Sequence, residues 1–262
     1  MKGKISFIGS GNVAFNLARA FDLSGYQIHQ VISRNEQTGK ELSGKYAAFY
    51  DKDISALMAD ADFVFLCVPD KSIESIATRI KTNGPLIMHC AGSCSLQTIS
   101  EYVNPTAVFY PLQTFTKDRQ ADFNKIPILI EAVDFKTYQA VRDLAFTISN
   151  RVIELDSQKR LYLHLAAVIA NNFTNHLLAQ SEKIVQAQQL PFDLLKPLVE
   201  ETVKKAFEGS PSNNQTGPAV RNDQTTIQKH LDILTDDKDL KNLYQIISNH
   251  ISAEKTNLKP PF

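Results

Sequence analysis

Apolar and polar positions follow two alternating patterns over the first 155 residues of the chain. Short apolar runs, typical of buried strands, are separated by stretches whose apolar residues recur every three or four positions, as in helices. This pattern predicts strands over residues 4–8, 27–32, 46–50, 62–68, 85–90, 106–110, 126–130 and 151–155, and helices over 15–23, 54–59, 70–80 and 135–148. Regular alternation of strands and helices is typical of an α/β fold with a doubly wound sheet, so one such domain is predicted over residues 1–155.

The pattern changes after residue 155. Residues 160–189 include neither Gly nor Pro and carry apolar side chains around most of a helix, which predicts one long, largely buried helix. Further helices are expected over 193–207, 225–234 and 239–251, so residues 156–262 are predicted to form an all-helical domain that ends in an irregular tail at 259–262. Three short helices are too few to bury the apolar side chains of the long helix. We therefore expect a homodimer through the helical domain. The alternative is that the long helix packs on the first domain.

A glycine-rich turn follows the first expected strand and precedes a helix. The sequence Gly9-Ser10-Gly11-Asn12-Val13-Ala14 is G-x-G-x-x-A in the strand-to-helix context that binds a dinucleotide in Rossmann-type domains. Gly9 permits the tight turn, Gly11 lets the backbone approach a pyrophosphate, and Ala14 lets helix and strand pack closely. The start of the helix offers unpaired N–H groups to the phosphates. We therefore expect the cofactor to contact Gly9, Ser10, Gly11, Asn12 and Val13.

The end of the second expected strand bears on the choice of nicotinamide cofactor. A site for NAD usually carries Asp or Glu there, which binds the ribose 2′-hydroxyl. Here the strand ends in Ser33-Arg34-Asn35, and a hydroxyl followed by an arginine suits a 2′-phosphate instead. We therefore expect NADP, bound at Ser33, Arg34 and Asn35, with Lys40 as a further cation. The alternative is that Arg34 is an ordinary solvated arginine of a surface loop.

The charge balance and the cysteines argue against several classes of function. The chain has 28 Lys and Arg against 28 Asp and Glu, without a basic block, so nucleic-acid binding is not expected. The N-terminal residues lead directly into a strand and no apolar run is long enough to span a bilayer, so we expect a cytoplasmic protein without membrane attachment. Cys67, Cys90 and Cys94 form no C-x-x-C pair and the histidine spacing fits no metal site, so neither a disulfide framework nor a metal is expected.

Several short motifs together resemble one superfamily. The chain resembles the pyrroline-5-carboxylate reductases, the 6-phosphogluconate and 3-hydroxyisobutyrate dehydrogenases and the deazaflavin-dependent NADP oxidoreductases in its glycine turn, in Ser33-Arg34-Asn35, in residues 64–70 and in its helical C-terminal part. It is similar to an NADP oxidoreductase branch of that superfamily, of unknown substrate, in residues 89–93, 110–115, 170–173 and 216–223. The resemblance implies a Rossmann domain, an all-helical second domain and NADP-dependent hydride transfer.

Two loops after expected strands are predicted to border the nicotinamide. In an open α/β sheet the ligand lies beyond the carboxyl ends of the strands. Val68-Pro69 and Ala91-Gly92 follow two such ends, so their backbone groups are expected to contact this end of the cofactor. Ser93 comes next, either as a substrate-binding residue or as the N-cap of a helix.

Polar residues on the long helix are the candidates for catalysis. His164, Asn171 and Asn175 recur on one helical stripe, with Asn172 beside it. The related dehydrogenases carry a lysine three or four residues before an asparagine on this helix, and here those positions are apolar. An imidazole can exchange a proton near neutral pH, so we expect His164 to donate a proton, with Asn172 and Asn171 orienting a carbonyl. The alternative is that these polar residues are paired within the fold.

The segment 216–223 joins a Gly-Pro turn to an arginine and a carboxylate. Arg221 could bind a substrate carboxylate through two hydrogen bonds, with Thr216 nearby. The alternative is that Asp223 caps the following helix and Arg221 pairs with it across the turn.

The residues leave two classes of function open. The first is an NADP-dependent oxidoreductase that transfers a hydride between NADP(H) and a small carbonyl, imine or hydroxy compound. The second is a noncatalytic NADP-binding or sensing protein, which the absence of the lysine favours. The resemblance adds a third alternative, hydride exchange with a deazaflavin partner.

Overall fold

The computed structural model describes residues 2–81 and 84–257. The chain divides into two compact units, residues 1–172 and 173–262, and each is considered by itself. The sequence-based boundary follows residue 155. The last strand ends at Glu154, and the first unit also includes the helix α6 (Ser157–Ala167). The tail expected over 259–262 lies outside the described residues.

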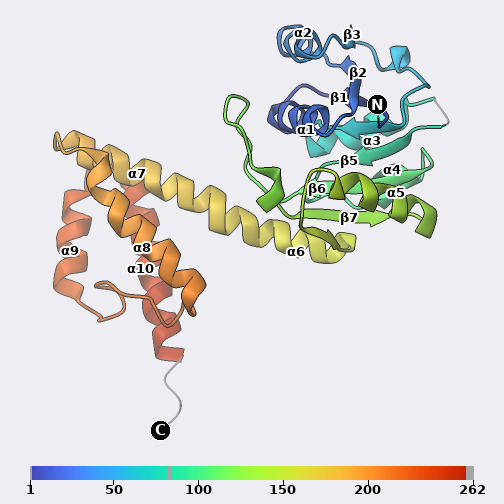
Figure 1. Cartoon of the computed structure of the whole chain (residues 1–262). Helices are drawn as coiled ribbons and strands as arrows, with labels where there is room; N and C mark the ends of the chain where they lie inside the picture. The colour runs from blue at the N-terminus through green and yellow to red at the C-terminus, as the bar shows by residue number, and fades with distance from the viewer. Residues whose placement is uncertain (1, 82–83, 258–262) are drawn as a thin grey trace. The chain divides into compact units, whose positions relative to one another are not determined.

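The first unit is built on an eight-stranded sheet (Figure 1). Its strands are β1 (Lys4–Ile8), β2 (Gln27–Ile32), β3 (Phe49–Asp51), β4 (Phe63–Leu66), β5 (Leu86–His89), β6 (Thr106–Pro111), β7 (Ile128–Ala132) and β8 (Val152–Glu154). They lie in the order β3-β2-β1-β4-β5-β6-β7-β8. Neighbours from β3 to β6 are parallel, β7 is antiparallel to β6, and β8 is parallel to β7. The predicted doubly wound α/β fold is confirmed, and its strand order reverses between β1 and β4, where such sheets bind ligands.

Alternation along the strands separates the core into two layers. Phe7 of β1 and Phe65 of β4 stack with centroids 5.4 Å apart on one face, while their neighbours Ile8 and Leu66 pack on the other. The first layer packs against α1 (Asn12–Leu23), α2 (Glu36–Lys45) and α5 (Phe135–Phe146). The second packs against α3 (Ile73–Ala77) and α4 (Gln97–Ser100). Short 3-10 turns fill three connections: η1 (Ile54–Ala56), η2 (Asp70–Ser72) and η3 (Phe123–Lys125).

The largest differences from the predicted elements lie between β2 and β4. The sequence pattern did not predict α2, because most of this helix is polar and it buries only Gly39, Leu42 and Ser43. The third strand begins at Phe49 rather than at residue 46, because residues 46–48 form the turn that ends α2, with Ala47 at φ +50°. The helix expected over 54–59 is a single 3-10 turn. A smaller difference follows β4, where the helix expected over 70–80 consists of η2 and α3.

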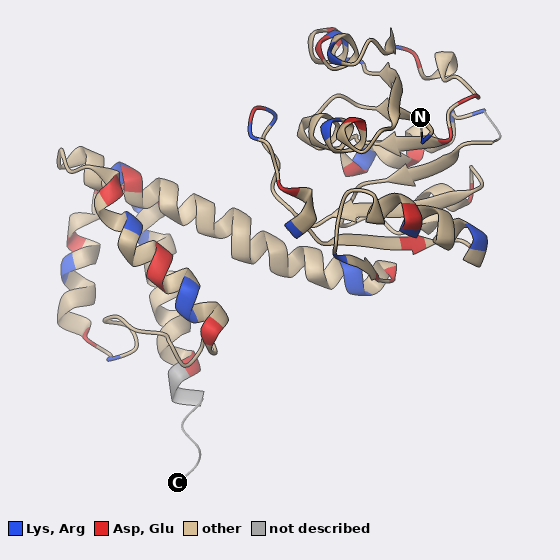
Figure 2. Cartoon of the chain, in the orientation of Figure 1, with Lys and Arg blue, Asp and Glu red and all other residues tan. Residues whose placement is uncertain are grey.

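The second unit is helical, as predicted. It contains α7 (Thr174–Ala187), η5 (Phe192–Leu195), α8 (Lys196–Glu208), α9 (Gln224–Ile233) and α10 (Lys238–Asn257). The expected long helix consists of α6, a π-helix η4 (Val168–Phe173) and α7. Residues 161–181 include no charged side chain, and Figure 2 shows this stretch in tan.

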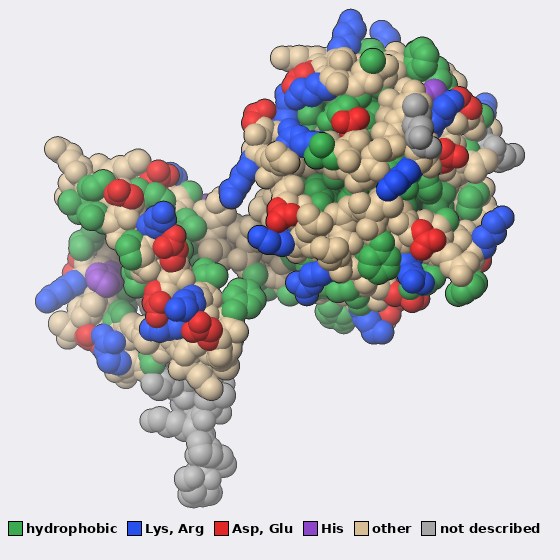
Figure 3. Space-filling model, viewed as in Figure 1, with side chains coloured by type: hydrophobic (Ala, Val, Ile, Leu, Met, Phe, Trp, Pro, Cys, Tyr) green, Lys and Arg blue, Asp and Glu red, His purple; other side chains and the backbone are tan. Residues whose placement is uncertain are grey.

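The prediction that the long helix is largely buried is wrong for the single chain. No residue of η4 or α7 is buried, and Ile169 and Phe173 are 53% and 57% exposed. Figure 3 shows hydrophobic side chains at the surface of the second unit among charged ones. Periodicity indicated an apolar helix correctly, but the pattern of one helix does not determine whether its apolar side chains are covered. No described helix is long and apolar enough to cross a membrane.

Candidate cofactor and active site

The glycine turn has the geometry that a dinucleotide requires. Gly9 has φ +105°, and a Cβ there would lie 2.1 Å from the carbonyl oxygen of Cys67. Its N–H also donates to the Ile32 carbonyl at 2.8 Å, so the turn is held against the ends of β2 and β4. Gly11 is the N-cap of α1 and contributes no side-chain cap, and a Cβ there would meet nothing within 4 Å. The start of α1 therefore has open space in front of its first N–H groups, where an anion can bind.

A cavity of about 830 Å³ begins at this turn and follows the ends of β1, β2 and β4. The structure brings together around it most of the residues expected to bind the cofactor: Gly9, Ser10, Gly11, Asn12, Ser33, Arg34, Asn35, Val68 and Pro69. These come from three separate loops. The cavity is thus formed at the carboxyl ends of strands that the structure places side by side.

Hydroxyl groups link the turn to the second strand. The Ser10 Oγ lies 2.7 Å from the Ser33 Oγ and 2.6 Å from the Thr38 Oγ1. The Asn35 side chain caps α2 by accepting from the Thr38 N–H at 3.1 Å. Ser33 is buried and Arg34 is exposed. Ser33 and Asn35 therefore shape this wall of the cavity, whereas Arg34 presents a cation at its edge.

Sequence reasoning missed three other cations that line this cavity: Lys52, Arg79 and Lys117. Arg79 pairs with Asp53 at 3.1 Å, and Lys117 pairs with Glu41. They lie in separate parts of the chain, so no local motif could have grouped them. Lys40, the further cation expected, does not line the cavity and instead pairs with Glu36 at 2.5 Å on the exposed side of α2.

A second cavity of about 500 Å³ shares Asn12 with the first. Its lining includes Val13 and the three predicted catalytic residues, His164, Asn171 and Asn172. Tyr110, which we did not predict, also lines it, and its hydroxyl oxygen lies 3.0 Å from the His164 Nδ1. Asn175, expected on the same stripe, is not among the lining residues. The structure thus groups the predicted polar residues of the helix with a tyrosine from β6.

Gly92 lies against this tyrosine and histidine. A Cβ at Gly92 would be 2.5 Å from the His164 Nδ1 and 2.9 Å from the Tyr110 Cζ. Ala91, its neighbour, is buried, and its N–H donates to the His89 Nδ1 at 3.2 Å. The predicted nicotinamide loop therefore packs directly on the pair.

His89 is structural in this arrangement. Burial is the main cause that lowers its pKa to about 4, so the ring is neutral at neutral pH. Because its Nδ1 accepts from Ala91, its Nε2 carries the proton and donates to the Ser95 carbonyl at 3.3 Å. His89 thus fixes the loop between β5 and α4.

Ser93 does not cap a helix, as one of our alternatives had expected. The N-cap position of α4 is Leu96, and the Ser93 hydroxyl donates to a carboxylate oxygen of Asp70. This bond joins the loop after β5 to the loop after β4. Ser93 remains a prediction as a substrate-binding residue.

A buried arginine anchors α6 to the sheet. Arg160 is 0% exposed, and its guanidinium donates to the Glu131 carboxylate of β7 and to the Cys94 carbonyl, each at 2.5 Å. His164 follows one helical turn later, so this anchor fixes the stretch of α6 that presents it.

The other two predicted substrate residues lie in the second unit. Thr216 and Arg221 are exposed. Asp223 caps α9 by accepting from the Thr226 N–H at 3.0 Å, as the alternative expected. The hydrogen bonds from Thr226 are the main cause that lowers the pKa of Asp223, and the charge of Arg221 adds to them.

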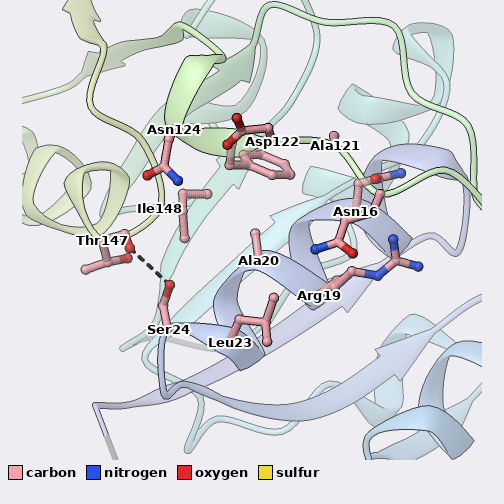
Figure 4. Close-up of a pocket in the computed structure, with 12 residues that line it drawn as sticks. Asn16, Arg19, Ala20, Leu23, Ser24, Ala121, Asp122, Asn124, Thr147 and Ile148 are labelled. Carbon is pink, nitrogen blue, oxygen red and sulfur yellow. Dashed lines mark hydrogen bonds between the residues drawn. The ribbon is translucent and has the colours of Figure 1, made fainter.

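A separate hollow of about 520 Å³ lies along the C-terminal half of α1. Figure 4 shows Arg19, Leu23, Asp122 and Asn124 around it, with the Ser24 hydroxyl donating to the Thr147 carbonyl at 3.0 Å. None of the predicted site residues lines it. The two cavities that share Asn12 are therefore the better candidates for the functional site.

Two family models match the chain. Residues 4–91 match the family described as NADP oxidoreductase, coenzyme F420-dependent, and residues 126–251 match a domain of unknown function. A Bacteroides fragilis protein provisionally assigned as an NADP oxidoreductase is 38% identical, with a TM-score of 0.90 over 96% of this chain and 98% of that one. An imine reductase from Myxococcus stipitatus, solved in complex with NADP+, has a similar fold at 14% identity, with a TM-score of 0.66 over 97% of this chain and 93% of that one.

A curated relative matches over a shorter length. The pyrroline-5-carboxylate reductase of Staphylococcus epidermidis is 30% identical over 108 residues, which is 38% of this chain. The chain thus spans 40% of the length of that relative.

Proposed function

Because the chain belongs to an NADP oxidoreductase family of the pyrroline-5-carboxylate reductase-like branch, we propose that it transfers a hydride between NADP(H) and a small carbonyl, imine or hydroxy compound. The observation that carries this proposal is the pair of cavities that meet at Asn12. One suits a dinucleotide phosphate, and the other holds polar groups suited to a substrate.

The larger cavity fits NADP on the chemistry of its wall. The pyrophosphate would lie over Gly11 at the uncapped start of α1, where neither a Cβ nor a capping side chain occupies the space. The 2′-phosphate would lie at Ser33 and Arg34, with Lys52 as a further cation on the lining. The nicotinamide would then extend past Val68 and Pro69 toward Ala91 and Gly92.

The smaller cavity supplies proton transfer and orientation. The bound NADPH supplies a hydride, and the chain must supply the proton that the reduced oxygen or nitrogen needs. His164 is the proposed donor, because an imidazole can both hold and release a proton near neutral pH. The side-chain amides of Asn172 and Asn171 would donate hydrogen bonds to the substrate carbonyl. Ser93, Thr216 and Arg221 do not line this cavity, and their expected substrate contacts stay predictions.

We also propose that the protein is a homodimer through its helical part. The support is the apolar surface of α7 and α8, in which no residue is buried by the chain itself. A second copy would remove this surface from water.

A second candidate function is hydride exchange with a deazaflavin. The match of residues 4–91 to a family described as coenzyme F420-dependent favours it. In that case NADP would bind as proposed, and the smaller cavity would accept the deazaflavin ring in place of a small substrate.

The decisive experiment is calorimetric titration of the protein with NADPH and with NADH. We expect clear preference for NADPH and a loss of roughly 10- to 100-fold in its affinity in Arg34→Ala, the effect of one charged hydrogen bond of about 1.5–3 kcal/mol. Lys40→Ala is the matched control, because Lys40 is a nearby lysine that does not line the cavity. Equal binding of NADPH to wild type and Arg34→Ala would overturn the proposed phosphate site.

Turnover separates an enzyme from a noncatalytic NADP-binding protein. Oxidation of NADPH should be followed with a panel of small carbonyl and imine compounds and with coenzyme F420. A substrate that supports oxidation should lose turnover in His164→Gln and Asn172→Ala, while the affinity for NADPH stays unchanged. Tight NADPH binding without oxidation by any compound of the panel would favour the sensing function.

A further inference from the structure

Tyr110 lies in contact with His164, the proposed proton donor, and its own role has no assignment in the proposed proton transfer. The Tyr110 hydroxyl lies 3.0 Å from the His164 Nδ1, and the rings meet edge to face with centroids 5.9 Å apart. Both side chains line the smaller cavity. We propose that Tyr110 is a positioning residue whose hydroxyl donates to the His164 Nδ1, so that His164 presents an Nε2–H group to the substrate. This inference rests on the proposed function.

The direction of this hydrogen bond follows from the chemistry of the two groups. A neutral imidazole has one N–H donor and one bare nitrogen acceptor, and a phenol is a strong donor while it stays protonated. Burial, the largest cause, and the charge of Asp70 raise the pKa of Tyr110, and Arg160 opposes them. The phenol therefore keeps its proton at neutral pH and can donate it to Nδ1, which is the direction we propose. The proton of the ring is then on Nε2, the nitrogen that Tyr110 does not occupy.

Gly92 makes this contact geometrically possible. Its Cα lies so close to the pair that a Cβ would come within 2.5 Å of the His164 Nδ1, which real Cβ atoms do not tolerate. The loop that is proposed to hold the nicotinamide therefore also packs against the hydrogen bond that orients the proton donor. Hydride and proton would then reach the substrate from neighbouring surfaces.

Arg160 and His164 lie one turn apart on α6, and the anchor at Arg160 limits how far the imidazole can move. The guanidinium binds Glu131 and the Cys94 carbonyl, both outside α6. Tyr110 is fixed independently, because it lies in the ladder between β6 and β7. Both partners of the pair are thus held by the sheet, as preorganised proton transfer requires.

The proton balance of the reduction is as follows. The hydride joins the substrate carbon, the Nε2–H bond of His164 breaks, and its proton joins the substrate oxygen or nitrogen. The phenol proton of Tyr110 passes to Nδ1 in the same step. After the product leaves, Nε2 takes a proton from water and Nδ1 returns its proton to the Tyr110 oxygen, which restores the starting pair. One hydride and one proton have then been added to the substrate, and NADPH has become NADP+.

Nitrogen NMR of histidine-labelled full-length protein tests the pair without needing a substrate. His164 is assigned by the loss of its signals in His164→Gln. In the wild type at a pH where the ring is neutral, we expect a protonated Nε2 and a bare Nδ1 whose resonance is displaced by an accepted hydrogen bond. In Tyr110→Phe, the Nδ1 resonance should return toward that of a free ring. Tyr162→Phe, an exposed tyrosine of α6, should leave it unchanged.

Two results would overturn the inference. One is a protonated Nδ1 in the wild type, which would make His164 the donor to Tyr110. The other is an Nδ1 resonance that is the same in wild type and Tyr110→Phe. Should Tyr110→Phe fail to fold, Gly92→Ala provides a second variant that displaces the pair, with Gly44→Ala as control, since a Cβ at Gly44 meets nothing within 4 Å.

Kinetics then connect the pair to the reaction. With any substrate that supports oxidation of NADPH, Tyr110→Phe should lower kcat about 10-fold, at the upper end for one hydrogen bond, and leave KM for NADPH unchanged. A change in KM alone would assign Tyr110 to binding and would contradict the inference. The proposed function fails separately, because absence of NADPH binding in the wild type would leave the NMR result unaffected.

Discussion

Three glycines around the candidate site are needed for different physical reasons. Gly9 is needed for its positive φ and its contact with the Cys67 carbonyl. Gly92 is needed because Tyr110 and His164 occupy the space where a Cβ would be. Gly11 meets neither condition, since its φ is −86° and the space beside it is open. The fold therefore leaves room for a Cβ at position 11, and the proposed pyrophosphate is the group that would need this space.

Replacing Gly11 with alanine separates folding from cofactor binding. Gly11→Ala should lower the free energy of unfolding by no more than about 1 kcal/mol, the cost of alanine at an N-cap, because the protein leaves room for the Cβ. It should bind NADPH roughly 10- to 100-fold more weakly, since a methyl group forced against a tightly packed ligand costs about 1–3 kcal/mol. Calorimetric titration and a melting curve measure the two effects. Gly44→Ala is the control that should change neither NADPH affinity nor fold, and wild-type affinity in Gly11→Ala would argue against a pyrophosphate at this turn.

The helical segment that carries His164 differs from a regular helix in a way that affects the site. We expected His164, Asn171 and Asn175 on one stripe at regular helical spacing. The π-helix η4 falls within this stretch, and its wider turns change which side chains share a face after residue 167. Asn171 and Asn172 line the cavity with His164, and Asn175 does not. Irregular turns of this kind are frequent at functional sites, which is consistent with the proposed role of both asparagines.

Substitution of Arg160, in the first turn of α6, tests whether this residue anchors the helix to the sheet. Arg160→Met should lower the free energy of unfolding by about 3 kcal/mol, because the largely buried Glu131 carboxylate would lose the cation that balances it. Urea denaturation measures this change. Lys159→Met, on the same turn but with an exposed lysine, should change the unfolding free energy by less than about 0.5 kcal/mol. Equal stability of the two variants would mean that the arginine is not the anchor of α6.

Apolar side chains are distributed very unevenly over the molecule. Both buried core clusters lie in the first unit. Among the described residues of 173–262, the buried apolar ones are Ala219, Ile227 and Leu231. Leu194, Leu198 and Phe207 are instead 63%, 66% and 90% exposed. Such a surface is unusual for a chain that acts alone and is typical of an interface.

Sedimentation tests the proposed homodimer. The wild type should sediment with twice the chain mass of 29.3 kDa. The double variant Leu194→Lys/Leu198→Lys should shift the protein toward the single-chain mass, because two charges would be buried without partners. Leu23→Lys, at a 72% exposed leucine of the first unit, should leave the dimer intact. A wild-type protein that sediments as a single chain at all concentrations would contradict the proposal.

Local sequence was sufficient where the signal is local. Neighbouring residues alone form the apolar pattern of the strands, the G-x-G-x-x-A turn and the Ser33-Arg34 pair. The doubly wound sheet and the place of the proposed cofactor could therefore be predicted from the sequence. The polar helix α2 was not predicted, because it buries few residues and its sequence therefore shows no clear helical repeat of apolar positions. His164 and the two asparagines were selected because polar side chains interrupt an apolar helix.

Contacts between distant residues were decided by the tertiary structure. Tyr110 and His164 are 54 positions apart, and the cations Lys52, Arg79 and Lys117 converge on one cavity from three separate segments. Nothing in the local pattern around Tyr110 or the three cations predicts these contacts. An amino-acid pattern determines which face of an element is apolar, because that depends on the repeat of its own backbone. Which side chains then meet depends on how whole elements pack together, and only the folded chain specifies that.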